Sequence, residues 1–450
     1  MIIKELNVDL KPFEIFLKFK SKDYLVFLDS CKNYKKLGKY SIITFDPFLK
    51  IKSKDGNIFV NSMKKDINVF ELLNKEYNKY KKSYKTDLPF IGGIVGHFSY
   101  DLCHEIEDLP KSAIDDVKIE DLNLGFYHGA IVFDHKKRKV FITDANIDDN
   151  GNKRIEKIRK IIKKENNNEF KVKESSKNPD LKANMTKTKY LESIKKIKDY
   201  IKNGDIYQVN MTQRFETDLT QKPINLYAKL RNINPAPFSA YMDFNDYQVL
   251  SSSPERFIKL KENILETRPI KGTRPRGKNK KEDNLLKKEL KNSEKDRSEL
   301  LMIVDLERND FSKVARTSTV DVKELFTIEK YPTVFHLVST IQCELDNNYN
   351  FVDVLKACFP GGSITGAPKI RAMEVIDELE PTTRNLYTGS IGYIDFNGDM
   401  DLNIVIRTML IKNKKVYFQV GGGIVWDSDP KAEYQESLDK AKALIEALSV

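Results

Sequence analysis

The chain is organised around Pro269-Ile270-Lys271-Gly272-Thr273-Arg274-Pro275-Arg276-Gly277. Prolines stiffen the backbone on either side of a lysine that is followed at once by glycine, so the ammonium group has a rigid support and two arginines downstream. Positive charge and desolvation both lower the pKa of a lysine, which is ordinarily about 10.4. The segment therefore predicts either a nucleophilic Lys271 or, with equal weight, a basic turn that faces solvent.

The composition is that of an ordinary folded protein. The chain has 450 residues, of which 40% are hydrophobic, so it can form one large or two medium domains with an ample core. Its formal net charge is +11, but no basic stripe is interleaved with aromatic residues as in a nucleic-acid surface. We therefore expect no nucleic-acid partner and interpret the charge as a background bias in composition that also helps to gather anionic substrates.

The N-terminus and the cysteines indicate a reducing compartment. The first five residues, Met-Ile-Ile-Lys-Glu, lack the apolar core of a signal peptide, and no uncharged apolar run approaches the roughly 18 residues of a membrane span. Cys31, Cys103, Cys343 and Cys358 show no Cys-x-x-Cys spacing, so neither a zinc site nor a disulfide framework is expected. We expect a cytoplasmic protein without a membrane partner.

The region 1–150 mixes strands and helices. Apolar runs predict strands at 24–28, 40–45 and 89–96, and the glycines of the last run imply a close backbone approach. This run loosely resembles residues 389–394, which is a weak sign of internal duplication. A helix is expected at 153–164.

A polar stretch follows this region. Residues 165–187 are polar and contain Pro179, so we expect a linker between an N-terminal region, 1–150, and a second region, 188–450. Thr188 is placed to cap the first helix of the second region, and Gly204 to end it.

The second region alternates strands with helices. Strands are expected at 205–209, 247–250 and 264–267, and the last of these leads to Lys271. Asn397-Gly398 between two apolar runs predicts a β-hairpin. At least part of the sheet is then antiparallel, which disfavours a Rossmann-type order.

Two pairs of acidic residues share one spacing. Asp296 and Glu299 are three residues apart, as are Glu433 and Glu436, so each pair lies on one face of a helix. Two such faces that converge would form an all-oxygen site suited to Mg²⁺. Glu433 also has a purely structural interpretation, because Pro430 is typical of a first helical position and the helix dipole favours a glutamate there.

Two glycine-rich segments can place backbone amides against an anion. Residues 361–368 precede an expected helix at 369–379, but they are not a phosphate loop, because Gly366 is followed by Ala367 and Pro368 and not by Lys and then Ser or Thr. Gly421-Gly422-Gly423 is a second such segment, or else a turn at a strand end. Arg407 lies on an apolar strand, where its charge requires a partner such as a substrate carboxylate.

These segments together resemble the chorismate-utilising enzymes, a family that includes anthranilate, aminodeoxychorismate, isochorismate and salicylate synthases. Besides the Lys271 segment, the matching motifs span most of residues 190–450 and are Ser252-Ser253-Pro254-Glu255-Arg256, Asp305-Leu306-Glu307-Arg308-Asn309-Asp310, His336-Leu337-Val338-Ser339, Gly362-Ser363-Ile364-Thr365-Gly366-Ala367-Pro368-Lys369, Ile404-Val405-Ile406-Arg407-Thr408 and Gly421-Gly422-Gly423. The resemblance implies an α+β fold with four layers, α/β/β/α, in which two packed and largely antiparallel sheets are enclosed by helices. The N-terminal region is expected to be interleaved with the C-terminal one.

The resemblance also implies a Mg²⁺ cofactor. Glu299 and Glu436 match the positions that hold a magnesium ion bound to the substrate carboxylate in relatives, with Asp296 and Glu433 in support. Relatives often carry Glu where this chain has Asp296.

Further positions are implied to contact the substrate. His336, which alone would be typical of a structural histidine, becomes a residue that orients substrate or assists proton transfer. Arg407 and Tyr387 are assigned to the enolpyruvyl end of chorismate. The other residues implied to bind substrate are Ser363, Thr365, Gly421, Gly422, Gly423, Gln208 and Thr273.

Two positions separate the branches of the family. Enzymes that add water to chorismate resemble one another in having lysine where this chain has Gln208, so that branch is disfavoured. Anthranilate synthases usually have alanine at the position of Lys271, whereas aminodeoxychorismate synthases have Pro-Ile-Lys-Gly-Thr; residues 235–241 also resemble the latter branch. The resemblance thus implies synthesis of 4-amino-4-deoxychorismate for p-aminobenzoate and folate, with anthranilate synthesis as the alternative.

The implied mechanism uses two residues. Lys271 adds to C2 of Mg²⁺-bound chorismate while Glu255 acts as the acid that expels the C4 hydroxyl. Ammonia then attacks C4 and displaces the lysine, with Glu255 available as base.

The ammonia is expected from a partner. None of the four cysteines is flanked by glycines as in the nucleophile of a glutamine amidotransferase, so a separate glutamine amidotransferase subunit is expected. No lyase domain is expected after the Glu436 helix. A second alternative is a non-catalytic sensor of chorismate or tryptophan, because relatives have a tryptophan pocket that would lie at Asp29-Ser30 and Tyr40-Ser41; the retained Lys271 and Glu255 argue against a dead enzyme.

Overall fold

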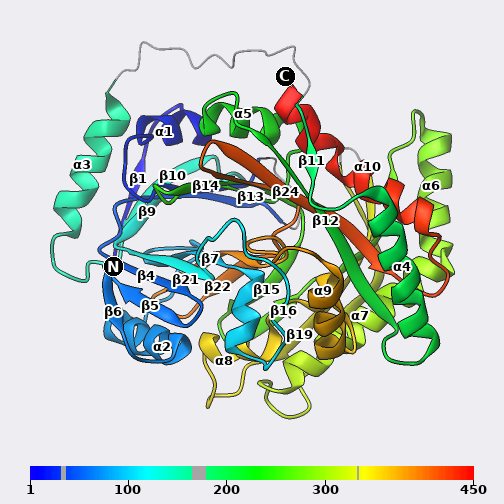
Figure 1. Ribbon diagram of the computed structural model, residues 1–450. Coiled ribbons are helices and arrows are strands. Elements are labelled where there is room, and N and C mark those ends of the chain that lie inside the picture. The colour runs from blue at the N-terminus through cyan, green and yellow to red at the C-terminus, as the bar shows by residue number, and fades with distance from the viewer. Residues whose placement is uncertain (32–36, 165–178, 332–333, 450) are drawn as a thin grey trace.

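Two twelve-stranded antiparallel sheets face each other in the computed structural model, which describes residues 1–31, 37–164, 179–331 and 334–449 (Figure 1). Across the first sheet the order is β1 (Ile2–Leu6), β10 (Lys139–Asp144), β9 (Gly129–Asp134), β3 (Tyr40–Thr44), β2 (Val26–Asp29), β13 (Phe238–Asp243), β14 (Tyr247–Ser253), β23 (Thr408–Lys412), β24 (Lys415–Ile424), β12 (Gln208–Asp218) and β11 (Lys182–Ala183), with β20 (Gly366–Ala367) also paired to β12. Across the second sheet it is β17 (Ile270–Pro275), β19 (Val334–Glu344), β16 (Ile264–Thr267), β15 (Arg256–Lys261), β22 (Met400–Asn403), β21 (Ser390–Asp395), β7 (Gly93–Phe98), β8 (Leu122–Tyr127), β4 (Leu49–Lys54), β5 (Asn57–Val60) and β6 (Met63–Lys65), with β18 (Asp321–Lys330) also paired to β19.

Helices cover the outer faces of both sheets (Figure 1). The α-helices are α1 (Pro12–Lys18), α2 (Val69–Tyr80), α3 (Gly151–Lys163), α4 (Lys187–Lys202), α5 (Pro223–Ile233), α6 (Lys280–Asn292), α7 (Glu294–Ser312), α8 (Phe351–Cys358), α9 (Lys369–Leu379) and α10 (Pro430–Ser449). Two short 3₁₀ helices are η1 (Tyr100–Glu105) and η2 (Gly362–Ile364).

Alternate residues of the first sheet face two different cores. On β2, Val26 packs in the core between the sheets, whereas Phe27 packs in a second core beneath the outer helices; on β3, Ile42 and Ile43 are divided in the same way. This alternation follows from the two-residue period of a strand that is covered on both sides. Four layers result, so the predicted α+β fold with two packed, largely antiparallel sheets is confirmed.

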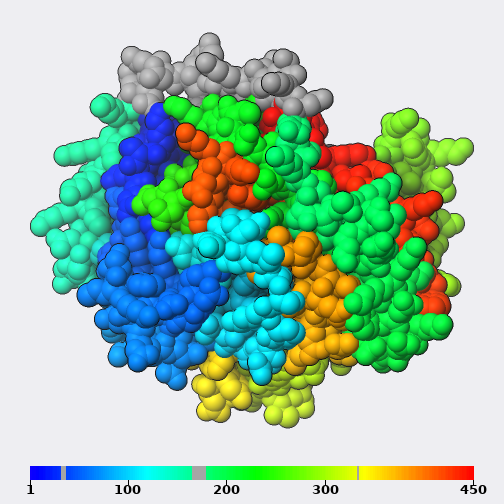
Figure 2. All heavy atoms as spheres, in the orientation of Figure 1, coloured from blue at the N-terminus to red at the C-terminus, as the bar shows by residue number. Residues whose placement is uncertain are grey.

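The two ends of the chain are interleaved within both sheets. In the first sheet β2 pairs with β13, and in the second sheet β7 pairs with β21. The two glycine-containing runs whose resemblance was a weak sign of duplication are therefore direct neighbours, with Gly96 opposite Gly392. Figure 2 shows N-terminal segments in blue and cyan lying against C-terminal segments in orange on one continuous surface.

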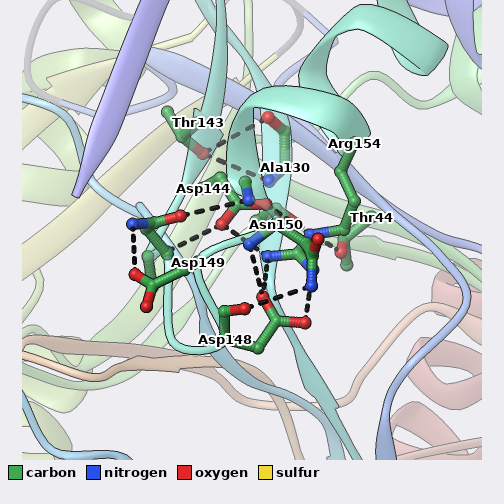
Figure 3. Close-up of polar contacts among 12 residues, drawn as sticks. Thr44, Ala130, Thr143, Asp144, Asp148, Asp149, Asn150 and Arg154 are labelled. Carbon is green, nitrogen blue, oxygen red and sulfur yellow. Dashed lines mark hydrogen bonds and ion pairs between the residues drawn. The ribbon is translucent and has the colours of Figure 1, made fainter.

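Arg154 links α3 to the end of β10 in the first sheet (Figure 3). Arg154 donates through Nε to Asp144 Oδ2 at 2.7 Å and through Nη2 to Asp144 Oδ1 at 3.0 Å, and its Nη1 donates to Asp148 at 2.8 Å. The forked guanidinium matches the carboxylate at the end of β10, which makes this a strong contact. The helix predicted at 153–164 exists, but it begins at Gly151.

The predicted cap of the next helix was wrong. Thr186, not Thr188, caps α4, because its backbone is extended and its hydroxyl oxygen accepts from Lys189 N at 3.2 Å. Of the predicted linker, residues 165–178 lie outside the described residues, whereas Lys182–Ala183 already form β11 against β12. The predicted helix at 369–379 and the hairpin around Asn397-Gly398 are confirmed as α9 and as the pair β21 and β22.

The cysteines are free thiols, and three of the four are buried. Among the residues that the structure describes, no helix is long and apolar enough to cross a membrane.

Candidate active site

The candidate site lies where two connections pass between the sheets. β14 of the first sheet leads through Glu255 into β15 of the second, and β22 of the second leads back through Arg407 into β23 of the first. Backbone hydrogen bonds join the two crossings, since Ile404 N donates to Glu255 O and Ser252 N donates to Arg407 O, both at 3.1 Å. The path of the backbone therefore brings the segment that carries the carboxyl of Glu255 next to the segment that carries the guanidinium of Arg407.

Lys271 lies at an irregular position in β17. The register of β17 against β19 shifts between Lys271 and Thr273, so the intervening glycine forms a bulge that re-aims the adjacent side chain. Gly272 has a φ of +77°, and a methyl group there would lie 2.8 Å from Asp296 Cγ, so only glycine fits. The Lys271 ammonium donates to Ser363 O at 3.2 Å.

Lys271 and Glu255 are both biased toward their neutral forms. Burial lowers the pKa of Lys271, although the nearby carboxylates of Glu299 and Glu255 oppose the shift. Burial raises the pKa of Glu255, although the Ser363 hydroxyl, which donates to Glu255 Oε1 at 2.8 Å, opposes it. Both shifts lie in the direction that favours nucleophilic attack by the amine with acid assistance from the carboxyl.

Arg407 has a charge available for a ligand. Within the described residues, its guanidinium makes no hydrogen bond or ion pair, and its pKa is lowered by burial against the opposing effect of Glu255. Burial, and then Arg407, lower the pKa of His336 to about 3, so that imidazole is neutral. His336 Nδ1 lies 2.9 Å from Thr273 Oγ1. An unpaired guanidinium beside a neutral imidazole is suited to a carboxylate ligand.

Gln208 and the three glycines of β24 line another side of the candidate site. Gln208 is buried, and its Oε1 has no hydrogen-bond partner among the described residues. A methyl group on Gly423 would lie 2.0 Å from Gln208 Nε2 and 3.5 Å from Lys271 Nζ. Gly421, Gly422 and Gly423 continue β24 in register with β12 and do not form a terminal turn. The absence of a side chain at Gly423 therefore leaves the room that Gln208 occupies next to Lys271.

The loop that carries Ser363 is fixed from behind by Arg384, which the sequence did not single out. Arg384 is buried, pairs with Glu380 at 2.8 Å and donates through Nη1 to Ile364 O at 2.9 Å. The spacing of four residues between Glu380 and Arg384 was the only sequence signal for this pair. The Thr365 hydroxyl donates to Gly361 O at 3.0 Å, so it braces the same loop from within.

Tyr387 lies beside the Arg407 segment. Thr388 N donates to Val405 O at 2.7 Å, two residues before Arg407. The phenol lines a small cavity together with Arg384, and burial raises its pKa. The predicted contact of Tyr387 with the enolpyruvyl end of a substrate stays a prediction.

The four predicted metal ligands do not form a closed cage. In the described part of the chain, no group of three or more His, Cys, Asp or Glu side chains is placed to hold a metal ion. Asp296 is paired with Arg274 at 3.0 Å, and Glu436 with Lys440 at 2.9 Å. Glu433 accepts a hydrogen bond from the Ser428 hydroxyl at 2.7 Å.

The chemistry of these carboxylates nevertheless fits Mg²⁺. Burial raises the pKa of Glu299, and Glu433 adds to the shift; burial likewise raises the pKa of Glu433, and Glu436 adds to it. Carboxylates that disfavour one another's charge are relieved by a divalent cation. Because Mg²⁺ is usually bound by one or two carboxylates with substrate oxygens and water, Glu299 and Glu436 would be the residues that hold it, although Glu436 is paired with Lys440 in this structure.

Two more side chains belong to the site although the sequence gave them no role. Glu307 on α7 accepts from Thr267 Oγ1 at 3.0 Å, and burial, with Glu255 nearby, raises its pKa to about 8. Lys440 donates to Gly421 O at 2.9 Å. Lys440 follows Glu436 by four residues on α10, which is the signal that could have identified it.

The N-terminal pocket expected at Asp29-Ser30 and Tyr40-Ser41 corresponds to a cavity between the sheets. Asp29, Ser30 and Tyr40 line a space of about 210 Å³, and Ser41 hydrogen-bonds behind it to Ser30 N at 3.0 Å. Tryptophan binding in this cavity stays a prediction.

The comparison with known families decides what kind of site this is. The model of the chorismate binding enzymes matches residues 24–446. The chain belongs to the chorismate binding enzyme family. The expected family is thereby confirmed, and this protein is a chorismate-utilising enzyme.

Relatives of this chorismate-utilising enzyme include two aminating synthases. Anthranilate synthase component 1 of Aquifex aeolicus is 39% identical over 466 residues, which cover 99% of this chain and 94% of that protein. Aminodeoxychorismate synthase component 1 of Escherichia coli is 43% identical over 368 residues, which cover 82% of this chain and 79% of that protein. The crystal structure of anthranilate synthase component I from Streptococcus pneumoniae TIGR4 has a TM-score of 0.83 and 34% identity, and the match covers 92% of this chain and 93% of that one. Identity alone does not separate the two reactions.

Proposed function

We propose that this enzyme is the large subunit of an aminodeoxychorismate synthase, which converts chorismate and ammonia to 4-amino-4-deoxychorismate. The observation that carries the proposal is Lys271, a partly buried amine with a lowered pKa beside a buried carboxyl, Glu255. An amine at this position supplies a nucleophile for substitution at the far end of the diene. Alanine, which anthranilate synthases usually have there, supplies none.

The first half of the proposed reaction is an addition with loss of water. The neutral amine of Lys271 forms a bond to C2 of chorismate, the two ring double bonds shift, and the C4–O bond breaks. Glu255 transfers its proton to the departing hydroxyl, which leaves as water. The new secondary ammonium then returns a proton to the Glu255 carboxylate.

The second half of the reaction returns the ring double bonds to their original positions. Ammonia forms a bond to C4, the double bonds move back, and the C2–N bond breaks as Glu255 protonates the departing lysine amine. The ammonium group on C4 then gives a proton to Glu255, so both residues return to their starting states.

Charges on the substrate have matching partners in the site. Arg407 is free to bind the enolpyruvyl carboxylate through two parallel hydrogen bonds, and neutral His336 orients the ligand beside it. Glu299 and Glu436 would hold Mg²⁺, which would neutralise the ring carboxylate of chorismate. Ammonia would come from a glutamine amidotransferase subunit, in keeping with the component names of the relatives.

Product identity tests the proposal. Purified protein, chorismate, Mg²⁺ and an ammonium salt are incubated at mildly alkaline pH, and aminodeoxychorismate lyase is added to half of the sample. We expect p-aminobenzoate only in the half with lyase. Anthranilate without lyase would overturn the assignment to this branch while leaving the family intact.

Lys271→Ala tests the covalent role. We expect the variant to lose amination at C4 or to redirect it, and mass spectrometry of wild-type protein quenched during turnover should show an adduct that the variant lacks. Formation of aminodeoxychorismate by Lys271→Ala at the wild-type rate would contradict the mechanism.

A second candidate is anthranilate synthase component I. The observation in its favour is that the Aquifex relative matches 99% of this chain, against 82% for the Escherichia coli aminodeoxychorismate synthase. The product assay distinguishes the two, because anthranilate needs no lyase. A chain that binds tryptophan or chorismate without turnover in either half of the assay would instead be a sensor.

A further inference from the structure

A second cavity lies between η1 and α9, outside the candidate active site. It has a volume of about 120 Å³ and is lined by Tyr100, Asp101 and His104 of η1 and by Met373 of α9, among others. Arg384, which donates to the last residue of η2, forms part of its wall. Figure 2 shows the cyan segment that contains η1 against the orange segment of α9. This space is called the η1 cavity below.

The η1 cavity has an apolar floor. Tyr100, Cys103 and Met373 form a small buried cluster against which Leu109 packs, and all four residues line the cavity. A cavity of about 150 Å³ with an apolar lining holds benzene. The η1 cavity therefore has room for a chain of about three carbon atoms with one polar end.

The charge around the η1 cavity is negative. Among the described residues, seven aspartate and glutamate side chains line it, against three of lysine and arginine. Two of these three cations already have partners, because Lys54 pairs with Asp115 at 2.6 Å and Asp121 at 3.0 Å, and Arg384 pairs with Glu380 at 2.8 Å. The third is an exposed lysine. A lining with this excess of acids attracts a cation and repels an anion.

Hydrogen-bond acceptors at the η1 cavity are left without donors. Tyr100 is 5% exposed, and within the described residues neither its buried hydroxyl nor His104 Nδ1 has a hydrogen-bond partner. Burial lowers the pKa of His104, so its imidazole is neutral. Asp101 accepts only from Asn385 N, at 2.9 Å, in the described part of the chain. A phenol oxygen, a neutral imidazole and a carboxylate all accept from N–H groups, so the group that is missing is a donor with several N–H bonds.

We propose that the η1 cavity is a binding site for a small primary ammonium ion with a short apolar chain. The ammonium group lies against Asp101, with the Tyr100 hydroxyl and His104 as further acceptors, and its three N–H bonds match these three groups. The chain packs on Cys103 and Met373. This site does not depend on which product the enzyme makes from chorismate.

Asp101 makes the affinity for such an ion depend on pH. Burial, and then Asp121 on β8, raise the pKa of Asp101 to about 8, with Lys54 on β4 opposing the shift and Asp115 adding to it. A bound ammonium ion favours the charged carboxylate, so binding releases the proton that Asp101 holds below this pH. The affinity therefore rises with pH up to about 8, because an alkylammonium ion stays protonated there, as lysine does with its pKa of about 10.4.

Fluorine NMR with 3-fluoropropylammonium as the probe measures binding without turnover. The width of the probe resonance is titrated against the whole protein at pH values of about 6 and about 8. We expect half-saturation at about 1 mM or below at the higher pH, and a concentration at least about tenfold greater at the lower pH. Unlabelled propylammonium should displace the probe.

A neutral analogue separates the charge from the apolar floor. The alcohol 3-fluoropropanol has the same chain without the ammonium group and should not bind. Binding of the alcohol as tight as that of the ammonium ion would overturn the proposal, because the cavity would then select for the chain alone.

Variants locate the probe in the η1 cavity. We expect Asp101→Asn to raise the half-saturating concentration at least about tenfold and to remove its dependence on pH, since a charged hydrogen bond is lost. Tyr100→Phe removes only a hydroxyl and should raise this concentration at least about threefold. Asp108 is exposed in the loop after η1 and does not line the cavity, so Asp108→Asn is the matched control and should change neither value.

Two results would contradict the site. Wild-type affinity and pH dependence in a folded Asp101→Asn variant would place the probe elsewhere. If Asp101→Asn does not fold, the wild-type titration decides, and an affinity that does not rise between pH values of about 6 and about 8 would overturn the proposal.

Discussion

Glu307 shows how one buried carboxyl links stability to pH. Its pKa is about 8 in the folded protein, against an ordinary value of 4.5, so between these pH values the folded state keeps a proton that the unfolded state has lost. The free energy of unfolding therefore falls as pH rises through this window, since the unfolded state binds fewer protons. Glu307→Gln removes the effect. Relative to wild type, we expect the variant to gain at least about 1 kcal/mol between the two ends of the window, measured by urea unfolding at several pH values. If the free energy of unfolding changed with pH in the same way in both proteins, the raised pKa of Glu307 would be contradicted.

The carboxylates of the candidate metal site are expected to contribute unequally to Mg²⁺ affinity. Glu299 carries a raised pKa among other acids, whereas Asp296 is already paired with Arg274. We expect Glu299→Gln to raise the Mg²⁺ concentration needed for half-maximal activity by at least about 10–100-fold, the cost seen even for outer partners of a metal. Asp296→Asn is the matched control on the same helix and should have a much smaller effect. If both variants raised the required Mg²⁺ concentration equally, Asp296 would contribute to Mg²⁺ binding as much as Glu299.

The residues of this site differ in whether their role could be predicted from the sequence. Lys271, Glu255 and Ser363 belong to motifs, and in the structure Ser363 contacts both of the others: its carbonyl oxygen accepts from the Lys271 ammonium and its hydroxyl donates to Glu255. Glu307 also lies in a matching motif and Arg384 lies in none, but the role of each comes from what packs against it in space. A charged residue in a polar stretch looks solvent-exposed until the fold buries it.

The connection from η2 to α9 depends on a buried ion pair. Arg384 pairs with Glu380 and donates to Asn210 O at 2.6 Å and Ile364 O at 2.9 Å, so one guanidinium holds the Ser363 loop against β12. We expect Arg384→Met to destabilise the protein by about 3–5 kcal/mol, because the buried Glu380 carboxylate loses its only oppositely charged partner among the described residues and keeps only neutral hydrogen-bond donors. Urea unfolding measures the loss. Arg384→Met with Glu380→Leu should recover part of the stability, and no recovery would mean that the loop contacts, not the ion pair, carry the energy.

Elements with a strong local signal could be predicted, whereas their ends could not. The helix at 369–379 and the hairpin at Asn397-Gly398 have apolar periodicity and turn residues of their own. The start of α4 was misplaced because Thr186 and Thr188 are equally good caps by residue type, and only the extended backbone of Thr186 distinguishes them. The bulge at Gly272 likewise depends on β19, which is far away in sequence.

The order of strands could not be read from the sequence beyond what family resemblance supplied. β2 lies beside β13 and β7 beside β21, so neighbours in the sheets are some hundreds of residues apart along the chain. Local propensity contains no information about such pairings. Resemblance predicted the interleaving of the two regions, but not which strands meet.

This interleaving predicts how the molecule responds to being divided. Both sheets and the core between them take strands from residues 1–164 and from 179–450, so each fragment alone would expose apolar faces that the other covers. We expect either fragment expressed alone to be insoluble, and the two co-expressed fragments to co-purify and recover turnover of chorismate. The matched control carries the same break with Val26 and Ile42 on the first fragment changed to Asp, which places charges in the inter-sheet core and should abolish recovery. If residues 179–450 were soluble and active alone, the two regions would be independent domains, and the shared sheets would not be needed to build the site.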